Sequence, residues 1–292
     1  MNRAGWITVA VLHGVLLFGA GFAPYAYDEQ HRTYSYAPPS LSVRGPEGCR
    51  VEWLRSGRLF TASAPCGVFV LGTDAYGRDV LSRVLFGGRI SLLAGLLATL
   101  LALVLGTAAG TVAGYFGRWP DRVLMRGGEL MMALPWLYLL LAVRAVLPLH
   151  LGPFAGFVLV VGTVGCLGWV RPSRLVRSLV LSVRERGYVQ AALGFGGTSW
   201  YVIHRHVLPE VRGLVITQAT VLLPQFLLAE VTLSFLGLGI GEPLPSWGNM
   251  LAEARQYFAL VSHPWLLAPG ILLVPLLFVY FTVADRLVGE GT

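Results

Sequence analysis

The sequence contains no lysine, and all 22 of its lysine-or-arginine positions are arginine. A phosphate-binding P-loop requires a lysine, so the chain does not hydrolyse ATP through such a loop. Charge of either sign is scarce, at 13% of residues against about 25% in soluble domains. With 55% hydrophobic residues, a soluble fold of 292 residues would lack polar cover. The composition therefore predicts a protein that crosses a membrane several times.

Motifs for enzyme chemistry are also missing from the sequence. It contains neither the HExxH motif of zinc hydrolases nor the GxSxG turn that presents a nucleophilic serine. The three cysteines, Cys49, Cys66 and Cys166, have spacings that match no zinc or redox motif. We therefore expect no catalytic residues, no metal site and no bound cofactor in this chain.

What the sequence does have is long apolar stretches. A helix needs roughly 20 apolar residues to cross the hydrocarbon core of a bilayer. Four stretches contain no Asp, Glu or Arg, a fifth contains Glu230, and a shorter one ends before Arg144, which can snorkel from a helix end. The predicted fold is an all-α membrane protein with six transmembrane helices. These are Ala4–Tyr27, Ile90–Gly117, Leu130–Val143, Ala145–Val170, Gly213–Gly239 and Gln256–Ala284.

The first stretch has an alternative interpretation as a cleaved signal peptide. Arg3 precedes its apolar run, and small residues between Gly19 and Ala23 end it. The run is long for a signal peptide, however, and Tyr25 and Tyr27 follow it as aromatic residues do at a membrane interface. We therefore favour a retained span.

Arginines in the short loops predict the orientation, because positively charged loops stay in the cytoplasm. With the N-terminus inside, 12 of the 22 arginines fall in inner segments, whereas the long outer segment translocates regardless of its charge. We expect both termini in the cytoplasm and the protein in a bacterial inner (plasma) membrane. The predicted parts are 1–27 with the first helix, an extracytoplasmic segment 28–89 with an interfacial helix, and a five-helix core 90–292 that includes a cytoplasmic loop, 171–212.

The outer segment carries a predicted hairpin and two aspartates. Cys49 and Cys66 flank VEWLRSGRLF, whose alternation predicts a β-hairpin; a disulfide across it and two free thiols are both consistent with the sequence. Asp74 and Asp79 could form a pair of catalytic carboxylates. We favour a helix cap at Asp74, followed by a short interfacial helix whose apolar face begins at Val80.

A row of glycines marks the second predicted span. Gly106, Gly110 and Gly114 recur at every fourth position. This small-xxx-small pattern lets a neighbouring helix approach closely. We favour packing against a helix of the same chain, with contact to a partner chain as the alternative.

Polar residues gather on the fifth predicted span. Glu230 is costly inside a membrane, and Ser234 follows it by one turn, while Gln218 and Gln225 form a second polar stripe. These residues predict the wall of a translocation path. The alternative for Glu230 is a hydrogen-bonded or ion-paired structural residue near the outer end of its helix, and the sequence leaves both interpretations open.

A polar, glycine-rich stretch, YVQAALGFGGTSWYVIHRHVLPE, lies between two predicted spans. Its pattern predicts a short helix over Tyr188–Phe195, a tight turn at Gly196–Gly197, and a second helix from near Trp200 that Thr198 or Ser199 caps. The small side chains of the first helix let a partner surface approach closely. An ordinary connecting loop is the alternative.

This stretch resembles the EAA loop of ABC-importer permeases, whose pattern is Glu-Ala-Ala, a later glycine and a Leu-Pro pair. The matching residues are Gln190, Ala191, Ala192, Gly196, Leu208 and Pro209. Two longer stretches resemble the C-type permease of the dipeptide, oligopeptide and nickel importers: LGTDAYGRDVLSRVLFGGRISLLAG (Leu71–Gly95) and LSFLGLGIGEPLPSWGNML (Leu233–Leu251). The resemblance runs from about Leu71 to the end of the sequence.

The resemblance implies a type I ABC importer permease that forms half of a translocation path. It implies that the EAA loop docks, as a coupling helix, into a separate ATPase that binds the ATP. The implied partners are a second permease subunit, two ATP-binding subunits and an extracytoplasmic solute-binding protein. The implied substrate is a peptide or a related small solute, and the sequence does not choose among them.

Gln190 departs from the family pattern, in which glutamate is usual. Glutamine keeps the shape and one acceptor but loses the charge, which removes about 1–3 kcal/mol of charge-assisted bonding at a partly buried contact. Docking should then depend more on packing, or on a partner ATPase that is changed to match.

Two other classes of function are alternatives. A channel or secondary transporter would leave the EAA-like loop without a role. A polytopic membrane enzyme could use Glu230 or the aspartates near Asp74, but the sequence offers it no nucleophile motif and no metal cluster.

Overall fold

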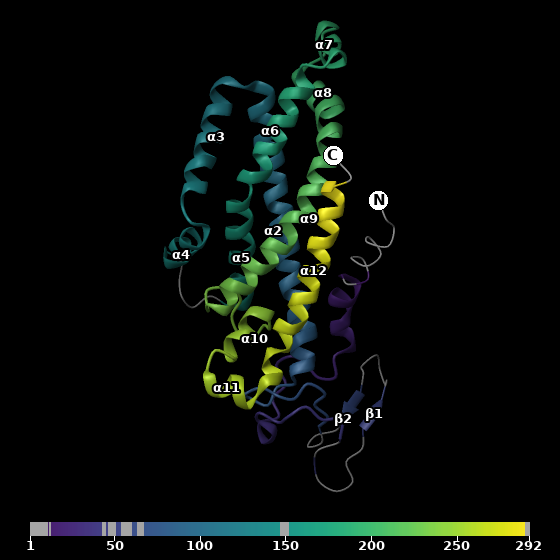
Figure 1. Ribbon diagram of the computed structural model, residues 1–292, viewed down its shortest axis with the longest axis vertical. Coiled ribbons are helices and arrows are strands. Elements are labelled where there is room, and N and C mark those ends of the chain that lie inside the picture. Colours follow the sequence, from purple (N-terminus) through teal and green to yellow (C-terminus); the bar gives the residue numbers. More distant parts are fainter. Residues whose placement is uncertain are drawn as a thin grey trace. The chain divides into compact units, whose positions relative to one another are not determined.

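The computed structural model describes residues 11, 13–42, 45, 51–53, 60–62, 67–146 and 152–289. Within that part of the chain, four helical segments are long and apolar enough to cross a membrane. They are Val80–Phe116, Pro153–Arg184, Ser199–Phe235 and Pro264–Ala284 (Figure 1). A shorter apolar helix, His13–Phe22, lies in the first predicted span. The predominantly helical membrane fold is therefore confirmed, whereas the count of six spans is not.

The chain separates into two compact units. Unit 1 comprises residues 1–94, 150–160 and 227–283, and unit 2 comprises residues 95–149, 161–226 and 284–292. Boundaries fall inside four helices: α2 (Val80–Phe116), α5 (Pro153–Gly168), α9 (Leu208–Phe235) and, near its end, α12 (Ala268–Gly289).

The part of unit 1 between the first predicted span and α2 contains the predicted pair of strands. Strands β1 (Val51–Trp53) and β2 (Phe60–Ala62) pair in antiparallel fashion, as the alternation of VEWLRSGRLF predicts. Cys49 and Cys66 lie outside the described residues, so their pairing stays a prediction.

Two single-turn helices, η1 (Gly19–Phe22) and η2 (Arg32–Tyr34), precede the hairpin in the chain. The buried side chains of this region are Tyr25, Ala37, Val68 and Phe69. The Tyr25 hydroxyl accepts a hydrogen bond of 2.9 Å from the Val68 amide, which ties the two ends of this region together.

Helix α2 begins earlier than expected. The Asp79 carboxylate accepts hydrogen bonds of 2.7 Å from both the amide and the hydroxyl of Ser82, and so caps a helix that starts at Val80. The prediction of a cap at Asp74 and a separate interfacial helix is wrong. No proline lies between Val80 and Phe116, so the lead-in and the span form one helix of 37 residues.

The C-terminal part of unit 1 is a chain of short helices before a long one. They are α10 (Trp247–Glu253), α11 (Tyr257–Ser262), the single turn η4 (Pro264–Leu267) and α12 (Ala268–Gly289). The sixth predicted span began at Gln256, but the spanning helical segment begins at Pro264. The break falls at His263, whose backbone is not helical (φ −134°, ψ 60°).

In unit 2, the third predicted span is not a single helix. Helix α3 (Arg118–Ala133) ends before Leu134, and α4 (Trp136–Val146) begins after Pro135. Pro135 disfavours a helical conformation in the residue before it, and Leu134 is extended, with ψ of 136°. The prediction of one helix over Leu130–Val143 is therefore wrong.

The fourth predicted span extends beyond its expected end. Helix α5 is followed almost at once by α6 (Val170–Arg184), so helical structure continues through the arginines that were read as the start of a loop. One of them, Arg177, forms a two-pronged ion pair with Asp121 of α3. The connecting segment predicted as 171–212 therefore starts after Arg184.

The glycine row of α2 lies against α6. A Cβ atom added at Gly106 would lie 2.8 Å from the Cγ of Pro172, and one added at Gly114 would lie 2.8 Å from the Cβ of Val180. Gly110 is equally close to α6, since a Cβ there would lie 2.5 Å from the carbonyl oxygen of Ser173. The close approach predicted within the chain is confirmed.

Candidate functional site

The EAA-like stretch folds into a compact helical segment of unit 2. It comprises α7 (Gly187–Gly194), α8 (Ser199–Val202) and the π-helical turn η3 (Ile203–Val207), and it leads into α9. We call Gly187–Val207 the α7–α8 segment. Figure 1 shows α7 at the tip of this segment, beyond the ends of α6 and α8. The prediction of two short helices joined by a glycine turn is confirmed.

The turn between the helices depends on Gly196. Its φ is +85°, a left-handed conformation that side chains with a Cβ rarely adopt. The next amide, of Gly197, donates a hydrogen bond of 2.9 Å to the carbonyl of Ala192, which closes the end of α7. Thr198 then caps α8, because its hydroxyl accepts from the amide of Tyr201 at 3.3 Å.

The segment is fixed to the end of α6 by an apolar core. Seven valines and Tyr115 form this core, and every valine is at most 1% exposed. The valines are Val176, Val180, Val183, Val189, Val202, Val207 and Val211. The helices on both sides of the glycine turn are therefore anchored by buried valines, Val189 in α7 and Val202 in α8, which predicts that α7 and α8 move together with α6.

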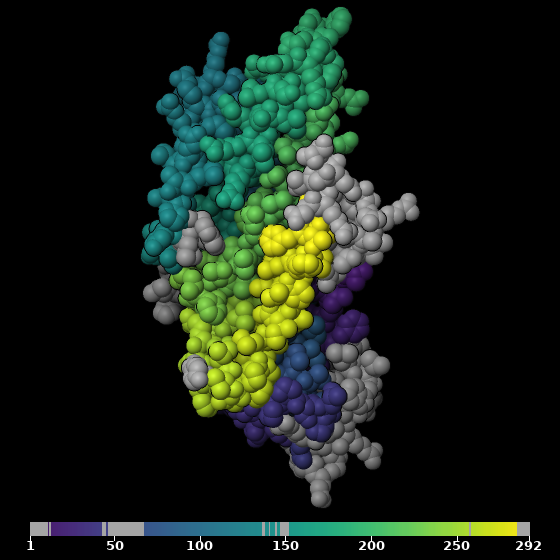
Figure 2. Space-filling model, in the orientation of Figure 1, coloured from purple at the N-terminus to yellow at the C-terminus, as the bar shows by residue number. Residues whose placement is uncertain are grey.

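The outward face of the segment carries large aromatic side chains. Phe195 is 92% exposed and Trp200 is 72% exposed, with Tyr188 and Tyr201 about half exposed. In Figure 2, the teal to green surface of this segment is not covered by other parts of the chain. Aromatic side chains are enriched in the centres of protein interfaces and uncommon in clusters on free surfaces. The arrangement is suited to docking into a groove of a partner protein.

The residues of the EAA-like pattern occupy different places in this segment. Ala191 is exposed, whereas Ala192 is half-buried and packs toward the valine core. Leu208 and Pro209 form the first turn of α9, with Leu208 half-buried and Pro209 exposed. The exposed aromatics beside them were not singled out from the sequence, although their place on either side of the glycine turn was a readable signal.

Gln190 acts as a donor. Its side-chain amide donates a hydrogen bond of 2.8 Å to the carbonyl oxygen of Arg184, at the last turn of α6. The sequence comparison with glutamate considered only the acceptor that the two side chains share. A glutamate at this position would have no hydrogen to offer to that carbonyl.

Glu230 and Ser234 lie in a polar cluster inside unit 1. Glu230 is 1% exposed, and the Ser234 hydroxyl donates to its carboxyl group at 2.7 Å. The hydroxyl groups of Ser91 and Ser246 also face this carboxyl group. Ser234 in turn accepts from the Ile240 amide at 3.0 Å, so the cluster holds the turn that follows α9.

Gln218 and Gln225, the second predicted polar stripe, are half-buried on the part of α9 that belongs to unit 2. In the described part of the chain, no group of three or more His, Cys, Asp or Glu side chains is arranged to hold a metal ion.

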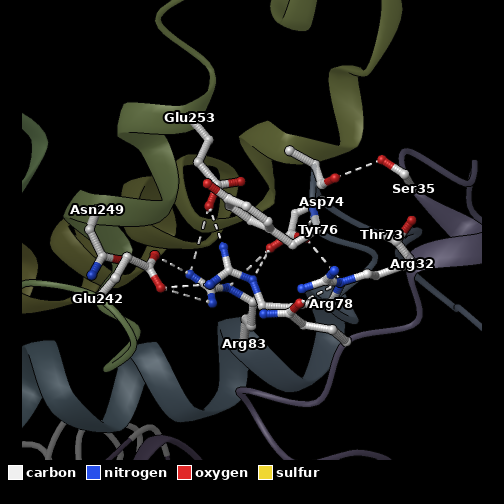
Figure 3. A network of polar contacts seen from close by, with 12 residues as sticks. Arg32, Ser35, Thr73, Asp74, Tyr76, Arg78, Arg83, Glu242, Asn249 and Glu253 are labelled. Carbon is white, nitrogen blue, oxygen red and sulfur yellow. Dashed lines mark hydrogen bonds and ion pairs between the residues drawn. The ribbon is translucent and has the colours of Figure 1, made fainter.

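A second polar cluster of unit 1 was not expected from the sequence. Arg78 pairs with Asp74 at 2.5 Å, with Glu242 at 2.6 Å and with Glu253 at 2.9 Å, and Arg83 pairs with Glu242 at 2.8 Å. Figure 3 shows the two guanidinium groups converging on these three carboxylates. We call these five residues the arginine clamp. It joins the loop before α2 to the loop before α10 and to α10 itself.

Burial sets the electrostatics of the arginine clamp. Burial and the nearby Asp74 charge raise the pKa of Glu253 to about 7, against the opposing effect of the two arginines. Burial would also raise the pKa of Glu242, but Arg83 and Arg78 outweigh it and lower that pKa. The clamp therefore holds one carboxylate firmly ionised and another that titrates near neutral pH.

The long apolar helices, and the compact helical segment between two of them, place the chain among multi-pass membrane proteins. The chain belongs to the family described as binding-protein-dependent transport system inner membrane component, whose model matches residues 102–289. It is thus a permease subunit of an ABC importer. The channel and enzyme alternatives find no support among its relatives.

Two relatives illustrate the similarity. The chain is 36% identical over 292 residues to the oligopeptide transport system permease protein OppC of Escherichia coli, covering 98% of this chain and 85% of that protein. It is 37% identical over 223 residues to the dipeptide transport system permease protein DppC of Alkalihalophilus pseudofirmus, covering 75% and 68%.

A solved structure supports the fold. The chain resembles a chain of the MetNI methionine ABC transporter in an inward-facing conformation, with a TM-score of 0.53 and 19% identity. The match covers 70% of this chain and 94% of the other.

Proposed function

We propose that this permease transports peptides or related small solutes, and that the α7–α8 segment couples it to a separate ATPase subunit. The observation that carries the coupling role is the combination of a buried valine core with exposed Phe195 and Trp200. A segment anchored to α6 in this way transmits a push on its aromatic tip to a membrane helix instead of absorbing it. The peptide substrate is supported by the names of the relatives.

The complex that this function requires has four further parts. We propose a second permease subunit, two ATP-binding subunits and an extracytoplasmic solute-binding protein, with both termini of this chain and the α7–α8 segment in the cytoplasm. ATP is bound by the partners, and this chain performs no catalysis. The arginines of the α7–α8 segment, of α3 and of α6 support this orientation, because arginine-rich segments between membrane spans stay on the cytoplasmic side.

The residues of α9 divide between two roles in this proposal. Gln218 and Gln225 contact the solute in the translocation path, since half-buried polar side chains on a membrane helix mark such paths. Glu230 and Ser234 instead fix the end of α9, because the Ser234 hydroxyl donates to one carboxyl oxygen of Glu230 and accepts from the Ile240 amide in the turn that follows.

The docking role is tested by removing one aromatic anchor. Trp200→Ala should weaken binding of the purified permease to its ATPase subunits by about 2 kcal/mol or more, as expected for an anchor at an interface centre. Trp119→Ala is the matched control, since Trp119 is 68% exposed on α3, outside the segment. Equal affinities of the two variants, measured by titration in detergent, would refute docking through this tip.

A further inference from the structure

A pocket lies beside the α7–α8 segment, where η3 passes into α9. Its volume is about 530 Å³, and it lies entirely within unit 2. Six of its lining residues matter here: Tyr188, Arg205, His206, Glu210, Arg212 and Ile216. The pocket shares Tyr188 with the aromatic face of the segment, but it includes neither Phe195 and Trp200 at the tip nor Gln218 and Gln225 of the proposed translocation path.

The pocket has an excess of positive charge. Its one carboxylate, Glu210, is already engaged, because Arg186 pairs with it at 3.2 Å and the Tyr188 hydroxyl donates to it at 3.1 Å. Arg205 and Arg212 are exposed and form no ion pair with any residue that the structure describes. Their guanidinium groups are thus available to an anion that enters the pocket.

The imidazole of His206 also faces this space and is held in place by aromatic rings. Its ring centroid lies 5.8 Å from that of Tyr188 and 5.7 Å from that of Tyr201. A pocket lined by two arginines and by a ring that packs against two tyrosines is more ordered than a loose patch of surface charge.

The pocket changes from charged to apolar along α9. Arg212 is the last charged residue before Glu230, and the residues between them form the apolar part of the helix. Ile216, one turn after Arg212, is 53% exposed and lines the apolar end of the pocket. Charged residues immediately before an apolar span lie at the level of the lipid headgroups.

We propose that this pocket binds the phosphate-bearing headgroup of an anionic phospholipid, with Arg205 and Arg212 on the phosphate and an acyl chain along Ile216. The side-by-side cationic and apolar surfaces match a phospholipid and do not match a small soluble anion, which has no use for the apolar end. The assignment to the cytoplasmic leaflet rests on the orientation in the proposed function. Bound lipid would brace the junction of η3 and α9 directly beside the coupling segment.

Lipid binding is measured on the purified, complete importer complex by native mass spectrometry, with phosphatidylglycerol and phosphatidylcholine titrated separately. The wild type should bind phosphatidylglycerol more tightly than phosphatidylcholine. The double variant Arg205→Gln with Arg212→Gln should lose roughly 30-fold in affinity for phosphatidylglycerol, from about fivefold per arginine near a membrane surface. Its affinity for phosphatidylcholine should change by less than about twofold, since the headgroup of that lipid has no net charge.

The matched control removes two other exposed arginines of unit 2. Arg122→Gln with Arg126→Gln takes the same charge from α3, away from the pocket. This variant should lose less than about threefold in affinity for phosphatidylglycerol, because only diffuse attraction is reduced. An equal loss in the two double variants would overturn the pocket, since it would mean that general surface charge attracts the lipid.

Two further arms separate this site from other occupants. Displacement of phosphatidylglycerol by inorganic phosphate at millimolar concentration would overturn the lipid assignment in favour of a soluble anion. Loss of the ATPase subunits from the pocket variant in lipid-free detergent would overturn it in favour of a protein interface. The proposed function is tested separately. Its tests measure ATPase binding by Trp200→Ala and coupling in Gly196→Val, and both variants leave Arg205 and Arg212 intact.

Discussion

The two units fix distant parts of the chain by contrasting means. In unit 1, the arginine clamp joins the loop before α2 to the region of α10 through charges that are buried on Arg78, Arg83 and Asp74 and half-exposed on Glu242. In unit 2, the α7–α8 segment is joined to α6 through a core of valines, and its aromatic tip is left outside. A buried ion network is costly to disturb because each removed partner leaves an uncompensated charge. A valine core with a free outer face holds position and still offers a surface to a partner.

The comparison leads to different expectations for the two regions. Changes in the arginine clamp should affect the stability of the whole fold. Changes at the surface or turn of the α7–α8 segment should affect coupling to ATP hydrolysis, with smaller effects on stability. The following predictions are arranged by the size of the expected effect on stability.

The largest loss is expected from Arg83→Gln. This change removes a buried guanidinium that lies 3.7 Å from the buried Asp74 and 2.8 Å from the half-exposed Glu242, and because Arg78 still pairs with both, the cost is about 3 kcal/mol, at the low end for a buried ion pair. The thermal midpoint of the purified permease should fall by several degrees. Arg89→Gln, on an exposed part of α2, is the control and should be near neutral. Similar midpoints for both variants would show that the clamp does not hold unit 1.

A smaller effect is expected from pH. The pKa of Glu253 is about 7 in the folded protein, above its ordinary value of 4.5, so the folded state binds more protons between these values. The stability due to this group is therefore full below about pH 4.5 and is lost as the pH rises through 7. In Glu253→Gln, the loss of unfolding free energy between pH 5 and pH 8 should be smaller than in the wild type by on the order of 1–3 kcal/mol. Thermal unfolding from pH 5 to pH 8 measures it.

Some slope should remain in that variant, because burial raises the pKa of Asp79 to about 6. Glu129→Gln, on exposed α3, is the control and should leave the slope as in the wild type. A Glu253→Gln protein with the full wild-type slope would mean that this carboxylate is not the titrating group.

The smallest effect is expected from Gln190→Glu. The structure changes the expectation from the sequence, which treated the charge of glutamate as the missing feature. Glutamate cannot donate to the Arg184 carbonyl and places a negative charge at the C-terminal end of α6, which costs about 0.5–1.5 kcal/mol. Hydrogen exchange of the α7 amides should be faster than in the wild type. Gln190→Ala loses the bond without adding charge, so a glutamate variant more stable than this one would contradict the account.

Features set by neighbouring residues were predictable from the sequence, whereas features set by distant residues were not. The turn at Gly196–Gly197 and the cap at Thr198 were predicted because the residues that determine them lie within a few positions of one another. The arginine clamp was not predicted, because Arg78 and Glu253 are 175 positions apart and no local pattern relates them. Their approach depends on the packing of unit 1 as a whole.

The predicted ends of the helices were wrong for a different reason. Counting charges placed the end of one span before Arg171, yet α6 continues to Arg184, with valines buried on one face and Arg177 paired with Asp121 of α3. Within Leu130–Val143 the apolar count outweighed Pro135, although that residue alone was enough to divide the helix. Local breakers were thus better guides than totals of charge.

The most direct test of the central claim is ATPase coupling in a Gly196→Val complex. Valine at φ of +85° strains the turn by on the order of 1–3 kcal/mol, although no atom within 4 Å would obstruct its Cβ. Gly196→Asn is the matched control, because asparagine tolerates the left-handed conformation. The measurement is solute-stimulated ATP hydrolysis and transport by the reconstituted importer. We predict that the asparagine variant keeps most of both activities, while the valine variant binds its ATPase weakly or hydrolyses ATP without transport. Normal coupled transport by the valine variant would contradict the claim that the α7–α8 segment is the coupling element.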